Sequence, residues 1–189
     1  TERVELRGVG IVLAASAMGV LRGIVGFLTF LVAFSLRSSD APTYQFGLVL
    51  AASGIGALLG SLVAPALRRA GMAEERILQI VLAATAVAGL LAAWAGRIAA
   101  AAALALCVGL AASSGKLAFD SVVQRDAPDA NRGRSFARFE TRFQLTWVVG
   151  AFLPVLITIP MAVGFVVIAA AAAFAVISYL AGLRGLARG

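Results

Sequence analysis

The sequence contains no histidine and a single cysteine among its 189 residues. Without histidine the chain cannot form a Ser-His triad, and it lacks the commonest metal ligand. Cys107 stands alone inside an apolar run, so no disulfide framework or cysteine-based metal site is available. An intramembrane aspartyl protease would need two aspartates at membrane depth, and only Asp120 meets that condition. We therefore expect no enzyme, no metal site and no cofactor.

Charged residues are also scarce. They make up 13% of the chain, whereas 61% is hydrophobic and the mean hydropathy is +0.98. A soluble domain is about 25% charged and about 45–50% apolar, so this chain has too little polar surface to cover itself in water. The net charge of +7 could suggest nucleic acid. However, the arginines lie in short gaps between apolar runs, where basic residues set the orientation of membrane helices. We therefore interpret them as topology signals and expect no nucleic-acid partner.

Six apolar runs follow one another along the chain, each near or above the roughly 20 residues that a helix needs to cross a bilayer. Alanine tracts such as AAAAAF favour helix over strand. We predict a single all-α membrane domain over residues 1–189, a bundle of six transmembrane helices. The predicted spans cover about residues 9–36, 45–67, 77–95, 98–122, 139–159 and 161–183.

Basic residues gather in alternate gaps between these runs. One set of gaps holds ten arginines and the opposite set holds only Arg37 and Arg97. The ten are Arg3, Arg7, Arg68, Arg69, Arg76, Arg125, Arg132, Arg134, Arg184 and Arg188. Cytoplasmic loops carry the excess of Lys and Arg, so we predict a cytoplasmic-membrane protein with both ends of this segment in the cytoplasm. The chain begins TERVELR, without methionine, and we expect it to be cut from a longer protein.

Arg22 lies about thirteen residues into the first run, near the bilayer midplane. A central arginine costs about 2.5–3.5 kcal/mol to insert, so it should face a partner or a wet cavity. Gly19, Gly26 and Thr29 share its helix face and leave room for something to approach. A structural arginine paired with a carbonyl or carboxylate is the alternative. The pairs Gly19–Gly23 and Gly56–Gly60 have the spacing of helix-packing motifs.

Lys116 and Asp120 are four residues apart and could pair on one face of the fourth helix. The alternative is that Lys116 extends its head to the membrane interface.

Residues 136–147 read FARFETRFQLTW and open onto the apolar run VVGAFLPVLI. Arg134 and Arg138 come at the start, where lipid headgroups would hold them as a topology anchor. We interpret one aromatic face as a packing or lipid face, formed by Phe136, Phe139, Phe143 and Trp147.

Glu140, Arg142 and Gln144 lie deeper in the same segment, where polar groups are costly and call for a cavity. Glu140 and Gln144 share one direction on the helix. We expect them to point into the bundle, where Lys116 or Arg22 would meet them.

Six spans with cytoplasmic ends, polar first, fourth and fifth helices and apolar third and sixth helices resemble the carboxy-terminal half of a major facilitator superfamily transporter. The run GSLVAPALRRAG looks like a worn copy of the loop motif of that family, in which Gly60, Arg68 and Arg69 match. Ala64, Pro65 and Leu67 replace the acidic, basic and glycine positions of the motif. The run from KLAFDSVV to GAFLPV also resembles a subgroup of bacterial transporters of this type.

The resemblance implies half of a bacterial secondary transporter that moves a small solute by alternating access, with a missing amino-terminal six-helix half as its partner. The expected substrate-cavity residues are Arg22, Gln144 and Trp147. The expected buried charge network, with proton coupling as one role, comprises Lys116, Asp120, Glu140 and Arg142. Glu140 is the favoured proton site because Lys116 would hold Asp120 ionised. The alternative function is a non-transporting lipid-binding or assembly module fused to another domain.

Overall fold

The chain forms six α-helices within residues 2–126 and 132–186, which are the residues that the structure, a computed structural model, describes. These are α1 (Glu2–Ser38), α2 (Thr43–Arg69), α3 (Glu74–Ala95), α4 (Ile98–Asp126), α5 (Arg132–Leu156) and α6 (Met161–Leu186). The prediction of an all-α chain is confirmed for these residues. Five helices cover the whole of their predicted spans and extend beyond them at one end or both, whereas α5 begins seven residues before its span and ends three residues before the end of the span.

The helices end where the sequence supplies helix breakers. Gly71 and Gly96 take positive φ angles of 85° and 60° after α2 and α3, a conformation that glycine adopts without steric cost. Asp40 has a φ of 50° in the connection from α1 to α2, which continues into Pro42. The segment 157–160 separates α5 from α6. Such short connections make neighbouring helices run antiparallel.

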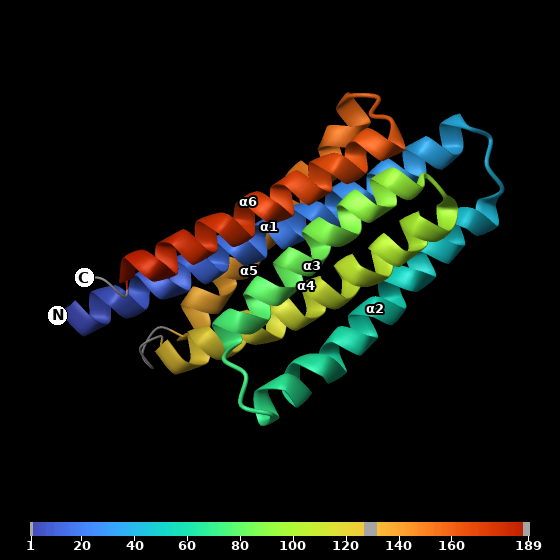
Figure 1. The fold of residues 1–189 in the computed structure, drawn as a ribbon. Helices are drawn as coiled ribbons and strands as arrows, with labels where there is room; N and C mark the ends of the chain where they lie inside the picture. The colour runs from blue at the N-terminus through green and yellow to red at the C-terminus, as the bar shows by residue number, and fades with distance from the viewer. Residues whose placement is uncertain (1, 127–131, 187–189) are drawn as a thin grey trace.

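Two central helices, α1 and α4, carry the other four (Figure 1). α5 packs mainly on α1 and α2 mainly on α4, while α6 and α3 pack on α1 and α4 respectively and on each other. The three helices α4, α5 and α6 therefore repeat the packing arrangement of α1, α2 and α3, with α4 in the place of α1, α5 in the place of α2 and α6 in the place of α3. Because each unit has three helices, the second unit starts at the opposite end of the bundle from the first, so the two units have inverted topology.

Glycines allow the backbones of both flanking helices to approach the central ones. A Cβ atom at Gly56 of α2 would overlap the carbonyl oxygen of Leu106 in α4. On the other flank, a Cβ at Gly150 of α5 would overlap the carbonyl oxygen of Gly23 in α1. Only a residue without a side chain fits at such crossings, as in the small-residue interfaces of membrane helices. The predicted packing role of Gly23 and Gly56 is confirmed.

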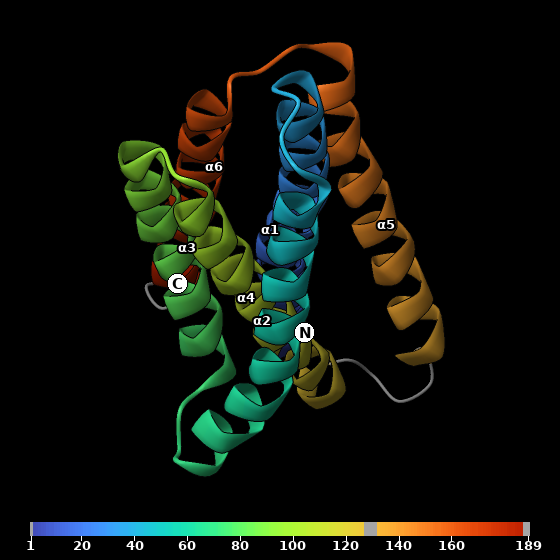
Figure 2. The ribbon, with the colours of Figure 1, turned by 90° about the vertical axis from the view of Figure 1, so that its right-hand side faces the viewer.

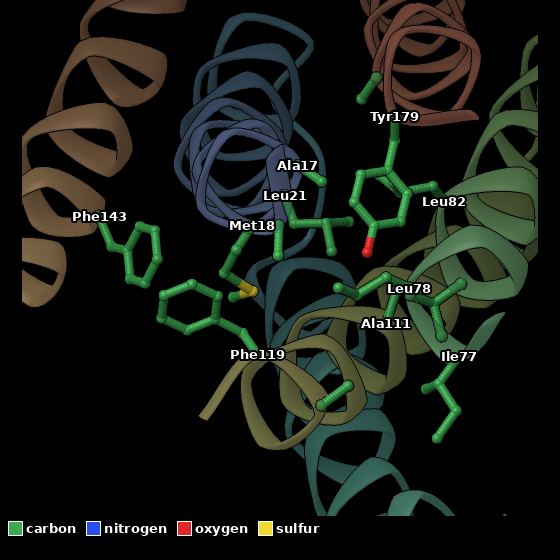
Figure 3. Close-up of a cluster of buried hydrophobic side chains, with 14 of the residues drawn as sticks. Ala17, Met18, Leu21, Ile77, Leu78, Leu82, Ala111, Phe119, Phe143 and Tyr179 are labelled. Carbon is green, nitrogen blue, oxygen red and sulfur yellow. The ribbon is translucent and has the colours of Figure 1, made fainter. Parts of the chain in front are cut away.

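Buried side chains form two clusters stacked along the bundle. One lies towards the end that holds the start of α1 and the end of α6. In it, Met18 and Leu21 of α1 lie between Phe119 and Phe143 on one side and Tyr179 on the other (Figure 3). The second cluster lies towards the opposite end and includes the buried side chains of Phe27, Leu31 and Phe165. Two residues of the aromatic face of α5, Phe139 and Phe143, therefore pack against α4, with the Phe119 ring edge-on to both.

Five of the helices in the described residues are long and apolar enough to cross a membrane, namely α1, α2, α3, α4 and α6. The exception is α5, whose first half carries Arg138, Glu140, Arg142 and Gln144. Large apolar side chains are also exposed on the outside of the bundle, among them Leu58 and Leu62 of α2 and Phe152 of α5. An apolar exterior of this kind requires lipid or protein around it. The fold therefore indicates a multi-pass membrane protein, and a crossing by α5 stays a prediction.

The alternating basic gaps meet at one end of the bundle. That end holds the start of α1, the α2–α3 and α4–α5 connections and the end of α6 (Figure 1). Its described side chains include Arg68, Arg69, Arg76, Arg125 and Arg184, whereas Arg37 and Arg97 lie at the opposite end. Arg188 and the side chains of Arg3, Arg7, Arg132 and Arg134 lie outside the part that the structure describes. The charge asymmetry is thus a property of the folded bundle.

Candidate functional site

An ion pair on α4 forms the centre of the candidate site. The Lys116 Nζ atom lies 2.6 Å from the Asp120 Oδ1 atom, and each side chain is only 25% exposed. The spacing of four residues places both groups on one face of the helix. The predicted pairing of Lys116 with Asp120 is therefore present.

Helix α5 adds a second carboxylate and an amide to this pair. The Glu140 Oε2 atom lies 3.6 Å from the Lys116 Nζ atom, and Gln144 Nε2 donates a hydrogen bond of 3.0 Å to Glu140 Oε1. We call these four residues (Lys116, Asp120, Glu140 and Gln144) the α4–α5 polar network. Together with the packing of Phe119 against Phe139 and Phe143, the network links α4 to α5. One ammonium group serves two carboxylates, the closer being Asp120.

Arg22 occupies the face of α1 between its contacts with α4 and α5. Met18 and Leu21 reach Gly115 of α4, while Gly23 and Gly26 meet the backbone of α5. The Arg22 Nε atom is buried and has no hydrogen-bond partner among the described residues. No carboxylate within those residues lies within salt-bridge distance of it, so Arg22 is not joined to the α4–α5 polar network.

The structure does not bring Trp147 or Arg142 to the network. The Trp147 ring packs edge-to-face on Phe30 of α1, with centroids 6.1 Å apart, and its carbonyl lies against Gly26. Trp147 therefore contributes to the α1–α5 interface. Arg142 follows Glu140 by two residues, a rotation of about 200° around the helix. Its side chain is exposed and lines a groove on the other side of α5.

The matched residues of the loop motif lie on α2, because this helix continues to Arg69 and the connection is only residues 70–73. Gly60 is buried against α4, and Ser114 Oγ donates a hydrogen bond of 3.2 Å to its carbonyl oxygen. The Arg68 guanidinium donates to the Ser121 hydroxyl of α4, and Arg69 is exposed. Gly60 is thus a packing residue inside a helix, while Arg68 joins α2 to α4.

Sequence reasoning missed a group of ion pairs at the same end. Arg125 lies at the end of α4 and pairs with two glutamates at the start of α3. Its Nη1 atom is 3.1 Å from Glu74 Oε2, and its Nη2 atom is 2.6 Å from Glu75 Oε1. The sequence offered one signal for this group, because Glu74 and Glu75 are adjacent and acidic residues are favourable in the first turn of a helix. Together with the Arg68–Ser121 hydrogen bond, these ion pairs tie the ends of α2 and α3 to α4.

The fold and the network together define the class as a multi-pass helical membrane protein with charged groups between two of its helices. No family model matches the chain. A curated protein of Mycobacterium leprae (strain TN), described as "Uncharacterized protein ML2143", is 28% identical over 154 residues. The match covers 79% of this chain and 26% of that protein, so the chain spans about a quarter of the length of the relative it matches.

Proposed function

We propose that the chain is half of a secondary transporter of the major facilitator type, which moves a small solute across the cytoplasmic membrane by alternating access. The α4–α5 polar network is the observation that carries this proposal. Charged groups inside membrane helices are costly and serve substrate or ion pathways in most cases. This network joins two helices whose other contacts are between side chains, chiefly Phe119 with Phe139 and Phe143, so a relative movement of α4 and α5 would change its contacts.

The inverted pair of three-helix units supports the same proposal. Each six-helix half of a major facilitator transporter contains such a repeat, and two halves rock around a central site. Exposed apolar side chains on α2 and α5, including Leu58, Leu62 and Val148, would then be covered by the second half or by lipid. The chain spans about a quarter of its relative, a length that leaves room for a further half in a protein of that size.

Charge balance gives the network a mechanism for proton coupling. With both carboxylates ionised and Lys116 protonated, the formal charge of the three groups is −1. A proton on Glu140 makes this charge zero, and a neutral group crosses or reorganises in a low-dielectric environment at lower cost. Glu140 suits this role better than Asp120, because it lies farther from Lys116 Nζ and its side chain is 43% exposed against 25%. Gln144 would hold the Glu140 side chain in place in both states.

Arg22 would attract the solute. It is a cation on the central helix α1 whose Nε atom is buried without a partner in the described residues. A solute with a carboxylate, phosphate or other acceptor group would satisfy it, and the surrounding small and apolar residues would accept a lipophilic body. We therefore propose an anionic or lipophilic small molecule as the transported class.

The second candidate is a non-transporting lipid-binding or assembly module. The apolar groove beside α5 is the observation in its favour. The remainder of the full-length protein separates the two candidates. Six further membrane spans would favour the transporter, whereas a soluble enzyme domain would favour the module.

The test starts from a strain that lacks the full-length protein, screened for altered growth or resistance on a panel of anionic and lipophilic compounds. Uptake or efflux of a compound found in this way is then measured in membrane vesicles with an imposed proton gradient. We expect Glu140→Gln to abolish proton-driven transport, because the amide cannot exchange the proton. Asp40→Asn is the matched control, a carboxylate lost from the exposed α1–α2 connection at a φ angle that asparagine tolerates. Unchanged proton-driven transport by Glu140→Gln would refute the coupling role.

A further inference from the structure

A groove of about 630 Å³ runs between α5 and α6, with α1 as its floor. α5 and α6 do not contact each other in the described residues, because α1 holds them apart (Figure 2). Gly19 and Gly23 of α1 and Gly150 of α5 line it and contribute no side chain. The α4–α5 polar network lies on a different face of α5, so this groove is separate from the site proposed above.

The lining is almost entirely apolar. Among its described residues, only Ser16, Arg142 and Thr146 have polar side chains, and Thr146 donates its hydroxyl hydrogen to the Phe143 carbonyl of its own helix. The lining on α5 runs from Phe139 to Leu153, about 21 Å at the rise of an α-helix. The groove is thus a long apolar channel that follows the direction of the helices.

Arg142 lies near the end of the groove that is closer to the basic end of the bundle. Its side chain is exposed, and no carboxylate of the described residues lies within salt-bridge distance of it. A long arginine side chain at this depth can carry its guanidinium to the membrane interface. A single cation at one end of an apolar channel complements an amphiphile with one anionic head.

The size of the groove favours a lipid chain over a helix. A helix 10 Å across and about 21 Å long occupies about 1,600 Å³, so most of a helix would lie outside the groove. A methylene group fills about the volume of a water molecule, about 30 Å³, so the groove holds about 20 of them. That is one acyl chain with part of its glycerol.

We propose that the α5–α6 groove binds one anionic glycerophospholipid, with an acyl chain between α5 and α6 and its phosphate on Arg142. The lipid would fill the space that α5 and α6 leave over α1 and would brace α5, whose main packing partner is α1. This binding does not depend on transport, and it could hold even if the proposed function fails.

The test is native mass spectrometry of the full-length protein, released from micelles that contain equal amounts of phosphatidylglycerol and phosphatidylcholine. We expect wild type to retain one phosphatidylglycerol in preference to phosphatidylcholine by about fivefold, the ratio given by one basic side chain at an anionic surface. Arg142→Gln should bring the ratio to about one without removing the bound lipid. Arg76→Gln, an exposed arginine at the same end on α3, is the matched control and should keep the preference.

A variant that fills the groove tests the chain-binding part. Ala171→Phe on α6 should lose both lipids, and Val149→Trp on the opposite wall is the second variant if the first does not fold. Equal retention of both lipids by wild type would overturn the proposal, as would an equal loss in Arg76→Gln and Arg142→Gln. A dimer that Ala171→Phe disperses, or a full-length protein that retains no lipid, would show that a second copy or another segment fills the groove instead.

Discussion

Helices α2 and α5 lie at equivalent places on the two flanks of the bundle, each packed on one central helix through glycine. Both also contain a proline, Pro65 in α2 and Pro154 in α5. They differ in the polar groups that they bring. The most apolar stretch of α2 has a mean hydropathy of 2.0, whereas α5 is not among the five helices that are apolar enough to cross a membrane. Of these two helices, only α5 contributes a carboxylate to an ion pair with a central helix within the described residues, namely Glu140 to Lys116 of α4.

The comparison of α2 and α5 separates the residues that the packing of the bundle requires from the residues that a function would require. The same backbone crossing is made twice, with Gly56 against Leu106 and Gly150 against Gly23. The architecture therefore asks only for small residues at the crossings and apolar residues around them. Glu140 and Gln144 have no counterpart in α2 that forms an ion pair within the described residues. Their presence in α5 is best explained by function.

The crossing glycines should give the largest effect on stability. Gly56→Ala places a methyl group on the Leu106 carbonyl oxygen, and Gly150→Ala does the same on Gly23. Each should lower the free energy of unfolding by about 1–3 kcal/mol, measured by SDS titration of the protein in micelles. Gly54→Ala is the control, two residues away on α2 with no atom near the added group, and should be neutral or stabilising by up to about 1 kcal/mol. Similar values for Gly54→Ala and Gly56→Ala would contradict the close crossing.

The two carboxylates that share Lys116 should differ in their coupling to it. Double-mutant cycles of Lys116→Met with Asp120→Asn and with Glu140→Gln measure both couplings in the same unfolding assay. Contacting charged residues couple by about 0.5–3 kcal/mol, and we expect the Asp120 coupling to be the larger because its oxygen is 2.6 Å away against 3.6 Å. A stronger coupling to Glu140 would reverse the assignment of the proton site.

The ion pairs at the basic end should matter least. Glu75→Gln removes a partner of Arg125, but Arg125 is 49% exposed and Glu75 29%. Exposed ion pairs contribute about 0–1 kcal/mol, so the loss should be small and should shrink further in high salt. Unfolding measured in low and high salt checks this. A loss above 2 kcal/mol, on the order of twice the upper limit for such pairs, would show that this end holds the fold more tightly than its exposure indicates.

Most of the fold could be predicted because its signals are local. Long apolar runs predicted the helices, and glycines with positive φ angles, Gly71 and Gly96, follow α2 and α3. The start of α5 was predicted at residue 139, seven residues late, because the polar residues before it carry no hydropathy signal although they are helical. Gly60 was predicted both as a packing residue and as part of a loop motif, and its neighbours in α4 confirm the packing role.

The site could be predicted only in part. Lys116 and Asp120 pair within one helix, which spacing alone reveals, and the shared direction of Glu140 and Gln144 matched their hydrogen bond. Helical spacing also separates Arg142 from Glu140, although both were grouped by depth. Other features depend on which helices are neighbours in space. Arg125 meets the start of α3 about fifty residues earlier in the chain. The Arg22 Nε atom is buried without a hydrogen-bond partner among the described residues, and this follows from the packing of three helices.

The claim of alternating access is tested most directly by the water accessibility of exposed positions on α5. This measurement requires no knowledge of the solute. Single cysteines at Gln144 and at Leu145, introduced after Cys107→Ser, are treated with a membrane-impermeant maleimide from each side of the membrane. Gln144 belongs to the polar network, whereas Leu145 lines the apolar α5–α6 groove and is 59% exposed. Alternating access predicts that Gln144→Cys reacts from both sides, in proportions that change with pH, while Leu145→Cys stays unreactive. Reaction of Gln144→Cys from neither side, or from one side under all conditions, would contradict the account.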